Sequence, residues 1–397
     1  MTAALQQIFE PKPESDNAGS FAPRVAILTV FVNPYRYPLF KSLESLVQEL
    51  QILCSAPEDE AGRPWPAEYS ELPMALQKGI IWRLKRKHHK GFIVPYCLYF
   101  PTDTIQRLRA FRPDVVISGE FGFRTLQALR YKKLRPSTKL IIWGTVSETS
   151  EKSRGLIRRC FRKWLLPKAD AVFVNGESGA RYLTSFGLAQ DRIFSITPSC
   201  SVSLFQGVQR EVPSCQSLRL VYVGQLIEQK GLIPFIAHLQ RWLRAHPGHH
   251  VRFKLVGDGP MRRELEHLST APGLKLEAVG NVPYQDVREH YVDADVFVFP
   301  SFDDEWGLVV NEALASGLPV LGSTGSQAVE ILVRDRINGW LFEPHQSDSV
   351  YGAIDRMLRT TPAEWKSLQE GARASVSHIT PENAANSIIN AIRTLGA

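Results

Sequence analysis

The sequence predicts an α/β protein built from two doubly wound, Rossmann-like domains that face each other across a crevice. Three observations lead to this prediction. A chain of 397 residues is too long for one ordinary hydrophobic core. Apolar strand patterns alternate with helical patterns, which is typical of parallel sheets covered by helices. That alternation breaks once, in a stretch rich in Ser and Pro at 199–217, and then begins again.

The first run of elements predicts an N-terminal domain at 23–198, after a flexible tail at 1–22 that lacks the features of a signal peptide. Runs of β-branched apolar residues predict buried strands, and apolar residues three and four apart predict helices. The predicted strands are 24–32, 50–56, 113–119, 139–145 and 170–176, and the predicted helices are 37–50, 123–134 and 153–169.

The second run predicts a C-terminal domain at 218–380, after a linker at 199–217. Its predicted strands are 218–224, 250–257, 274–280 and 295–301, and its predicted helices are 231–245, 260–268 and 285–294. Doubly wound sheets bind ligands outside the carboxyl ends of their strands, so we expect the functional residues at these strand ends.

Charge is distributed unevenly along the chain. Residues 1–200 hold 29 Lys and Arg against 18 Asp and Glu, whereas the rest of the chain holds 18 against 22. A basic half suggests an anionic partner such as a membrane surface, a phosphorylated acceptor or nucleic acid, and a solvated basic surface is the alternative. No nucleic-acid motif is recognisable, so no nucleic-acid partner is expected.

The cysteines indicate neither a disulfide framework nor a zinc site, because they are scattered and odd in number. They are Cys54, Cys97, Cys160, Cys200 and Cys215. A reducing cytoplasm is the natural interpretation, and no apolar window is long enough to predict a membrane-spanning helix.

A glycine-rich junction follows the first strand of the second domain. In "VYVGQLIEQKGL" the strand ends at Gly224, a helix begins near Gly231, and Lys230 lies between them. A helix start beside an ammonium group suits a phosphate, although a glycine after a strand is often only a tight turn. Gly257 belongs to a second such turn, "GDGP", which resembles half of a dinucleotide-binding fingerprint or is a plain structural corner.

Four carboxylates gather where another strand turns into a helix, in "FPSFDDEWGLVVNEALA". Residues seven or eight apart share a helix face, so Asp304 and Glu305 both qualify as the partner of Glu312. The backbone N–H groups of residues 306–309 could meet an anion, and carboxylates there could accept hydrogen bonds from a polyhydroxyl ligand. The alternative is that these acids only cap the helix. This alternative is sufficient to explain Asp303, which is expected to be a cap or solvated.

These motifs together resemble a known family. The run "GQLIEQKG … LVGDGP … VGNVP … ADVFVFPSFDDEWGLVVNEALASGLPVLGSTGSQAVEIL … NGWLF" is similar to the donor-binding domain of family 4 (group 1) retaining glycosyltransferases of the GT-B fold. The resemblance covers about 220–345, and five motifs agree in their spacing. It implies that 381–397 form a helix that packs back on the N-terminal, acceptor-binding domain.

The resemblance implies roles for individual residues. The family pattern is an acid, seven further residues and then Glu, with Phe or Trp and Gly after the first acid. Trp306-Gly307 would fix this frame, with Asp304 as the first acid and Glu312 as the second. Asp304 would then contact the donor sugar, and Glu312 would hold the ribose. Lys230 matches the lysine that neutralises the donor diphosphate, whereas Gln225 replaces the family's arginine and Asp304 replaces its usual Glu. The remaining implied site residues are Gly224, Gly257, Leu308 and Val309 for donor binding and Glu330 for a less defined role.

The N-terminal domain departs further from the family pattern. Many members carry a His after the strand that corresponds to 139–145, where this sequence has Trp143-Gly144-Thr145. Glu120 and Glu148 follow strand ends and are candidate catalytic carboxylates, although a solvated loop acid is the alternative for each. In retaining transfer the leaving diphosphate itself can deprotonate the acceptor.

The resulting prediction is a retaining, hexosyl-type glycosyltransferase that moves a sugar from a nucleotide-sugar donor to a hydroxyl acceptor, in polysaccharide or glycoconjugate biosynthesis of the cell envelope. No cofactor and no metal are expected. The alternatives are a nucleotide-sugar epimerase of the same fold and a non-catalytic nucleotide-sugar binder. The predicted location is the cytoplasm, at the inner face of the cell membrane if the basic half contacts it.

Two basic segments could make that contact, 83–90 and the helix near 153–166. On that helix Arg154, Arg158 and Arg162 share one face, opposite an apolar face with Ile157, Phe161, Trp164 and Leu165. Such a helix can lie on anionic lipid. The alternative is that its apolar face packs on the sheet and its arginines are solvated.

Overall fold

The computed structural model describes residues 22–57, 71–87, 93–151, 155–214 and 216–396. The chain divides into two compact units, Met1–Ser199 with Pro381–Ala397 and Cys200–Thr380. Each unit contains a parallel sheet with helices, so the predicted class of two Rossmann-like α/β domains is confirmed. That the two domains face each other across a crevice stays a prediction.

The N-terminal unit is a parallel sheet in the strand order β3-β2-β1-β6-β7-β8-β9. Its strands are β1 (Arg24–Thr29), β2 (Glu49–Cys54), β3 (Met74–Leu76), β6 (Val115–Ser118), β7 (Lys139–Trp143), β8 (Ala171–Val174) and β9 (Ile193–Ser195). Its helices are α2 (Arg36–Glu44), α3 (Thr104–Phe111), α4 (Phe123–Leu134), α5 (Leu156–Leu165) and α6 (Glu177–Thr184).

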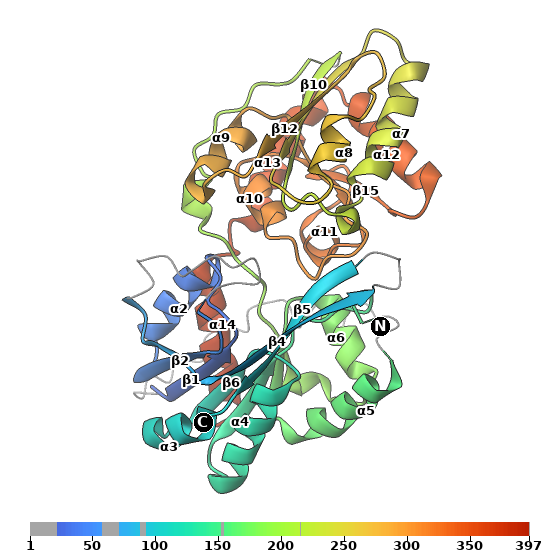
Figure 1. The fold of residues 1–397 in the computed structure, drawn as a ribbon. Coiled ribbons are helices and arrows are strands. Elements are labelled where there is room, and N and C mark those ends of the chain that lie inside the picture. The colour runs from blue at the N-terminus through green and yellow to red at the C-terminus, as the bar shows by residue number, and fades with distance from the viewer. Residues whose placement is uncertain (1–21, 58–70, 88–92, 152–154, 215, 397) are drawn as a thin grey trace. The chain divides into compact units, whose positions relative to one another are not determined.

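A C-terminal helix, α14 (Pro381–Thr394), belongs to this same unit. It lies beside α2 although about 340 residues separate them along the chain, as the red and blue helices of Figure 1 show. Ala385, Ile388 and Ile392 recur at helical spacing and pack into the core against β1 and β6. Burial of this stripe holds the end of the chain on the first domain.

An antiparallel hairpin was not foreseen from the sequence. Strand β4 (Gly79–Lys87) pairs with β5 (Ile93–Pro101), and Trp82 on β4 meets Phe100 on β5 with ring centroids 5.1 Å apart. Part of the basic segment 83–90 therefore lies on β4, and His88, His89 and Lys90 lie outside the described residues. The alternation of apolar and basic residues along 79–87 was the available signal for this strand.

The C-terminal unit is a parallel sheet in the order β12-β11-β10-β13-β14-β15. Its strands are β10 (Ser217–Val223), β11 (His250–Val256), β12 (Leu274–Gly280), β13 (Val296–Phe299), β14 (Val320–Ser323) and β15 (Gly339–Phe342). Its helices are α7 (Leu232–Ala245), α8 (Arg262–Glu266), α9 (Val287–Val292), α10 (Val309–Ala315), α11 (Gln327–Leu332), α12 (Ser347–Leu358) and α13 (Pro362–Val376).

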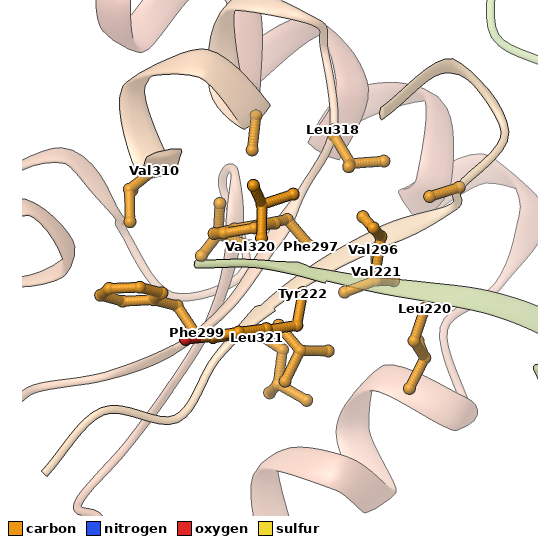
Figure 2. Packing of buried hydrophobic residues seen from close by; sticks show 14 of the residues in the cluster. Leu220, Val221, Tyr222, Val296, Phe297, Phe299, Val310, Leu318, Val320 and Leu321 are labelled. Atoms are coloured by element: carbon orange, nitrogen blue, oxygen red, sulfur yellow. The ribbon is translucent and has the colours of Figure 1, made fainter. Parts of the chain in front are cut away.

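The core of this unit centres on β10, β13 and β14, whose side chains are buried on both faces of the sheet. Figure 2 shows Val221, Phe297 and Val320 from these strands, together with Val310 of α10. Strands that are covered on both faces read as continuous apolar runs, which is why the sequence predicted β10 and β13, whereas the four-residue β14 was not predicted.

The predicted linker 199–217 begins at the boundary between the two units, and its residues from Cys200 onward belong to the second unit. Cys200, Val202, Phe205 and Val208 are buried, and the first three belong to the core of the second unit. The ring of Phe205 packs edge-on against that of Tyr291, with centroids 5.8 Å apart. Its polar and Pro-rich composition concealed these anchors, which are too widely spaced to form a periodic pattern.

No helix in the described parts of the chain is long and apolar enough to cross a membrane.

Candidate functional site

Three loops meet at the carboxyl ends of β10, β13 and β14, where the strand order of the C-terminal sheet switches direction. Strand β10 has β11 on one side and β13 on the other. The chain therefore continues from β10 toward one edge of the sheet and from β13 toward the other edge, and the position between these two strands is a topological switch point. This is the position where doubly wound sheets bind ligands.

The loops after β10 and β13 are joined by two hydrogen bonds. The Phe302 backbone N–H donates to the Gln229 carbonyl at 2.9 Å, and the Gln229 side-chain amide donates to the Asp303 carbonyl at 2.6 Å. Gly231, which ends a short 3-10 turn at Glu228–Lys230, has φ 65°, and a Cβ there would lie 2.4 Å from the Pro300 carbonyl oxygen. Only glycine fits this junction.

The ammonium of Lys230 forms an ion pair with the carboxylate of Asp304. Both side chains are 16% exposed, so the pair is shielded but reachable from solvent. The other Asp304 oxygen accepts a 3.4 Å hydrogen bond from the Trp306 N–H, and the Lys230 ammonium lies 5.5 Å from the centroid of the Phe299 ring. The structure therefore brings together two residues that the sequence singled out separately.

The loop after β14 completes this cluster. The Asp304 N–H donates to the Gly325 carbonyl at 3.0 Å, and the Gln327 side chain donates to the Glu305 carbonyl at 2.8 Å. Glu330 follows in α11 and is half-buried. Asp304 is thus held by all three loops, its carboxylate by Lys230 and the Trp306 N–H and its backbone N–H by Gly325.

Glu312 lies in α10 and is only 4% exposed. Its carboxylate accepts a 2.9 Å hydrogen bond from the Tyr291 hydroxyl, and Tyr284 also hydrogen-bonds to it. Burial raises the pKa of Glu312 to about 7, although these two hydrogen bonds act in the opposite direction. Near neutral pH this carboxyl can therefore exist with or without its proton.

Sequence reasoning missed the tyrosines and a cysteine around Glu312. Burial and the nearby charge of Glu312 raise the pKa of the Cys200 thiol, which places part of the expected linker next to this carboxylate. Tyr291 lies on the buried side of α9, where its sequence pattern predicts only packing. No local signal reveals that its hydroxyl reaches a residue 21 positions away.

Two of the predicted donor-binding glycines are required by packing within the loops. Gly224 has φ 148° and Gly257 has φ 134°, and a Cβ on Gly257 would lie 1.9 Å from the Gly224 carbonyl oxygen. Beneath them the buried Tyr222 donates to the Gln225 carbonyl at 2.8 Å, and burial and the charge of Asp304 raise its pKa. The side chain of Gln225 itself is exposed.

The residues after the acidic cluster have structural roles as well. Gly307 has φ 96°, and a Cβ there would lie 2.7 Å from the Phe299 ring. The Trp306 indole is buried and donates to Asn311 at 2.9 Å, while Leu308 and Val309 pack against the core. Helix α10 begins at Val309, so of the N–H groups at 306–309 that the sequence placed near an anion, those of 306–308 precede the helix.

Asp303 is neither the cap of α10, whose N-cap is Leu308, nor a solvated acid, so the expectation of a cap or a solvated residue is wrong. It is 3% exposed, whereas Asp304 and Glu305 are half-buried. Asp304 is the member of the cluster that forms an ion pair with Lys230, and its role as the partner of Glu312 stays a prediction.

The N-terminal candidates are both paired with arginines. Glu120 forms a 2.8 Å ion pair with the fully buried Arg124, and burial raises the pKa of Glu120 and lowers that of Arg124. Glu148 forms a 2.9 Å ion pair with Arg181. The Glu120 side chain is 33% exposed and the Glu148 side chain is 49% exposed, so both are arginine-paired acids that still meet solvent.

Over the described residues, no group of three or more His, Cys, Asp or Glu side chains is placed to hold a metal ion. The expectation of a metal-free, cofactor-free site stays a prediction.

Comparison with known proteins supplies relatives for the domain that contains this site. Residues 217–360 match the family described as glycosyl transferases group 1. Sulfoquinovosyl transferase of Arabidopsis thaliana is 37% identical over 273 residues, which cover 63% of this chain and 51% of that protein. An uncharacterised glycosyltransferase of Methanocaldococcus jannaschii is 33% identical over 141 residues, 35% of each protein. The chain thus spans between about a third and a half of these relatives.

Solved structures match over nearly the whole chain. The lipopolysaccharide outer core galactosyltransferase WaaB superimposes with a TM-score of 0.70 at 15% identity, covering 94% of this chain and 99% of that one. HepE of Anabaena, solved with UDP, gives a TM-score of 0.69 at 14% identity, with coverage of 94% and 100%. At these identities the likeness establishes the fold, and it confirms the predicted GT-B class.

Proposed function

We propose that this chain, whose residues 217–360 belong to the group 1 glycosyl transferases and whose fold is GT-B, is a retaining glycosyltransferase. It would move a hexosyl group from a nucleotide-sugar donor to a hydroxyl acceptor in glycoconjugate or polysaccharide biosynthesis. The observation that carries the proposal is the meeting of Lys230 and Asp304 at the switch point of the C-terminal sheet, in the same domain as the buried Glu312.

Lys230 would stabilise the leaving diphosphate. Charge develops on the diphosphate as the glycosidic bond breaks, and a preorganised ammonium in a shielded site stabilises that charge. Asp304 holds the ammonium in place before the donor arrives. With the donor bound, Lys230 would turn to the phosphates and Asp304 would accept hydrogen bonds from the sugar hydroxyls.

Glu312 would hold the ribose of the donor. An ionised carboxylate can accept hydrogen bonds from both hydroxyls of a ribose, and charge-assisted hydrogen bonds of this kind are the strong ones. The raised pKa of Glu312 means that the ionised form becomes dominant only above neutral pH in the free protein. Donor binding would favour ionisation, because the ribose hydroxyls would add hydrogen-bond donors to those of Tyr291 and Tyr284.

The acceptor is proposed only as a hydroxyl-bearing sugar, lipid-linked glycan or small molecule. Relatives of this chain are named as transferases to quite different acceptors. Among them are the GDP-Man:Man(3)GlcNAc(2)-PP-Dol alpha-1,2-mannosyltransferase of Xenopus laevis and the D-inositol 3-phosphate glycosyltransferase of Corynebacterium kroppenstedtii. Because these relatives are transferases, we do not pursue the epimerase alternative. The competing hypothesis is a non-catalytic nucleotide-sugar binder, because Gln225 stands where the family has an arginine and the site therefore has one cation fewer.

The test is a thermal-shift screen of the whole chain against UDP-, GDP-, ADP- and dTDP-sugars, followed by turnover with the donor that stabilises it. We expect one nucleotide class to raise the unfolding midpoint selectively, and release of its nucleoside diphosphate when an acceptor panel is added. NMR of the product should show that the anomeric configuration of the donor is kept. Donor binding without turnover across the panel would support the binder, and an inverted product would contradict retention.

We also propose that the protein works in the cytoplasm. The support is its cysteine chemistry, since Cys54 and Cys200 are buried free thiols whose pKa values burial raises. Buried thiols of this kind are inert packing residues that a reducing compartment leaves unchanged.

A further inference from the structure

Helix α5 presents its apolar side chains to solvent, contrary to the usual packing of an amphipathic helix. Leu156 is 79% exposed and Ile157 is 88% exposed, and Trp164 on the same flank is 47% exposed. An amphipathic helix at a protein surface normally buries such residues against the sheet. The sequence alternative in which this face packs inward is therefore wrong for Ile157 and Trp164, although it is right for Leu165.

The inward side of α5 is anchored by a buried arginine. Arg162 is 1% exposed, forms an ion pair with the buried Glu151 and donates to the Tyr182 hydroxyl at 2.5 Å. Its guanidinium also lies 4.8 Å from the Phe121 ring centroid. A buried arginine that loses its carboxylate partner is costly, so this pairing fixes which side of the helix faces inward.

The solvent side of α5 combines an apolar flank with a basic flank. At helical spacing, Leu156, Ile157 and Trp164 fall on one flank, and Arg159 and Lys163 fall on the other, both of them exposed. Residues 155–168 contain no Asp or Glu. This outward face of α5, defined by these five residues, therefore combines apolar and positively charged groups without a competing carboxylate of its own.

The surroundings of Trp164 resemble those of an aromatic residue that anchors a protein at a membrane surface. The Lys168 ammonium lies 4.4 Å from the centroid of the Trp164 ring and donates to the Trp164 carbonyl at 2.6 Å. An aromatic ring next to an ammonium suits the boundary between acyl chains and headgroups, where one side of the contact is apolar and the other is charged.

We propose that the outward face of α5 docks on a lipid bilayer that carries anionic headgroups. The apolar flank would enter the headgroup boundary while Arg159, Lys163 and Lys168 meet the negative charge of the surface. The absence of acids from this stretch matches a uniformly negative partner better than a protein surface of mixed charge. The inference is independent of the proposed function, since α5 belongs to the N-terminal unit and the Lys230–Asp304 pair to the other.

The experiment is co-sedimentation of the whole chain with two kinds of vesicle. One is phosphatidylcholine alone, and the other also contains about 30–40% phosphatidylglycerol, which gives the surface a negative potential. We expect binding to the anionic vesicles to exceed binding to the neutral vesicles about tenfold, and to weaken as salt is added. Equal binding to both vesicles would overturn the proposal.

Two pairs of variants separate the flanks. Leu156→Ser with Ile157→Ser should lower the partition into anionic vesicles about tenfold, because two apolar side chains no longer leave water. The matched control is Ile337→Ser, which removes a side chain that is 59% exposed in the other domain and should change nothing. Retained vesicle binding in the Leu156/Ile157 variant would overturn the docking of this face.

Arg159→Gln with Lys163→Gln should also lower binding to anionic vesicles about tenfold, and should flatten its salt dependence. Arg263→Gln with Lys366→Gln removes the same charge from exposed positions of the other domain and is the control.

Donor binding by thermal shift should be equal in all variants, so that failure of this inference is distinct from failure of the proposed function. If light scattering instead shows dimers that the Leu156/Ile157 variant dissociates, without vesicle binding, the face joins two copies and the proposal is wrong.

Discussion

The Lys230 ammonium and the Asp304 carboxylate form an ion pair across two loops, although 74 residues separate them in the sequence. This pair couples the residue expected to meet the diphosphate with the residue expected to meet the sugar. It also explains how a shielded ammonium is kept in place when the site holds no donor, because each charge compensates the other.

Replacement of Lys230 tests the diphosphate role. Lys230→Gln should weaken the binding of the selected nucleoside diphosphate about tenfold to a hundredfold, because a hydrogen bond to a charged group contributes about 1.5–3 kcal/mol. Isothermal titration calorimetry measures this change. Lys366→Gln, an exposed lysine of α13, is the control and should bind as the wild type does. Equal affinity in both variants would remove Lys230 from the site.

The neighbouring acids Asp304 and Glu305 are distinguished by substitution. Asp304→Ala should reduce transfer about tenfold or more, and Glu305→Ala should reduce it less, since Asp304 forms the ion pair with Lys230. Binding of the bare nucleoside diphosphate should not weaken in Asp304→Ala, because the ammonium then loses its competing carboxylate. Steady-state kinetics with the identified donor gives the order, and the reverse order would mean that the frame is wrong.

The buried Glu312 should make stability depend on pH. Its pKa in the folded protein is about 7, above the usual carboxyl value of 4.5. Between these two pH values the unfolded chain releases a proton that the folded protein keeps, so the free energy of unfolding falls as pH rises through this window. The loss is at most about 3 kcal/mol.

Denaturant unfolding at intervals between pH 4.5 and 8 measures this effect. The difference in unfolding free energy between Glu312→Gln and wild type should grow in favour of the variant up to about pH 7 and then stay constant. Parallel pH profiles for the two proteins would show that the carboxyl titrates normally. In the same series, donor affinity of the wild type should rise with pH, because the ionised carboxylate is the form that accepts hydrogen bonds.

The glycine at the meeting of the loops after β10 and β13 gives a stability prediction. Gly231→Ala places a methyl group 2.4 Å from the Pro300 carbonyl oxygen and also strains a backbone at φ 65°. Gly248→Ala strains a backbone at φ 96° but meets nothing within 4 Å, so it isolates the backbone cost of about 1 kcal/mol. Denaturant unfolding should show a larger loss, by about 1–3 kcal/mol, for Gly231→Ala. Equal losses would contradict the close packing of the two loops.

Much of the C-terminal domain could be predicted because its signals are local. Apolar runs predict the strands up to β13, and the family resemblance, through Trp306-Gly307, implies the choice of Asp304 as the partner of Glu312. The contact between Lys230 and Asp304, and that between Glu312 and Tyr291, depend on which strands lie side by side, so no local pattern reveals them. The anchors of the segment 199–217 were hidden by their polar neighbours for the same reason.

Helix α5 shows a different limit. Helical spacing correctly separates an apolar flank from a basic one, but it does not say which side faces inward. That choice is made by Glu151 and Tyr182, which accept hydrogen bonds from Arg162 and come from other parts of the chain. A buried arginine reverses the rule that apolar residues point to the core, and only its partners make that reversal stable.

The measurement that tests the central claim most directly is turnover of the identified donor by Glu312→Ala. The account predicts that nucleoside diphosphate release falls about a hundredfold or more, because two charge-assisted hydrogen bonds to the ribose are lost. Circular dichroism and the unfolding midpoint of the variant should remain those of a folded protein. Turnover at the wild-type rate in a folded Glu312→Ala protein would contradict the placement of the donor at this site.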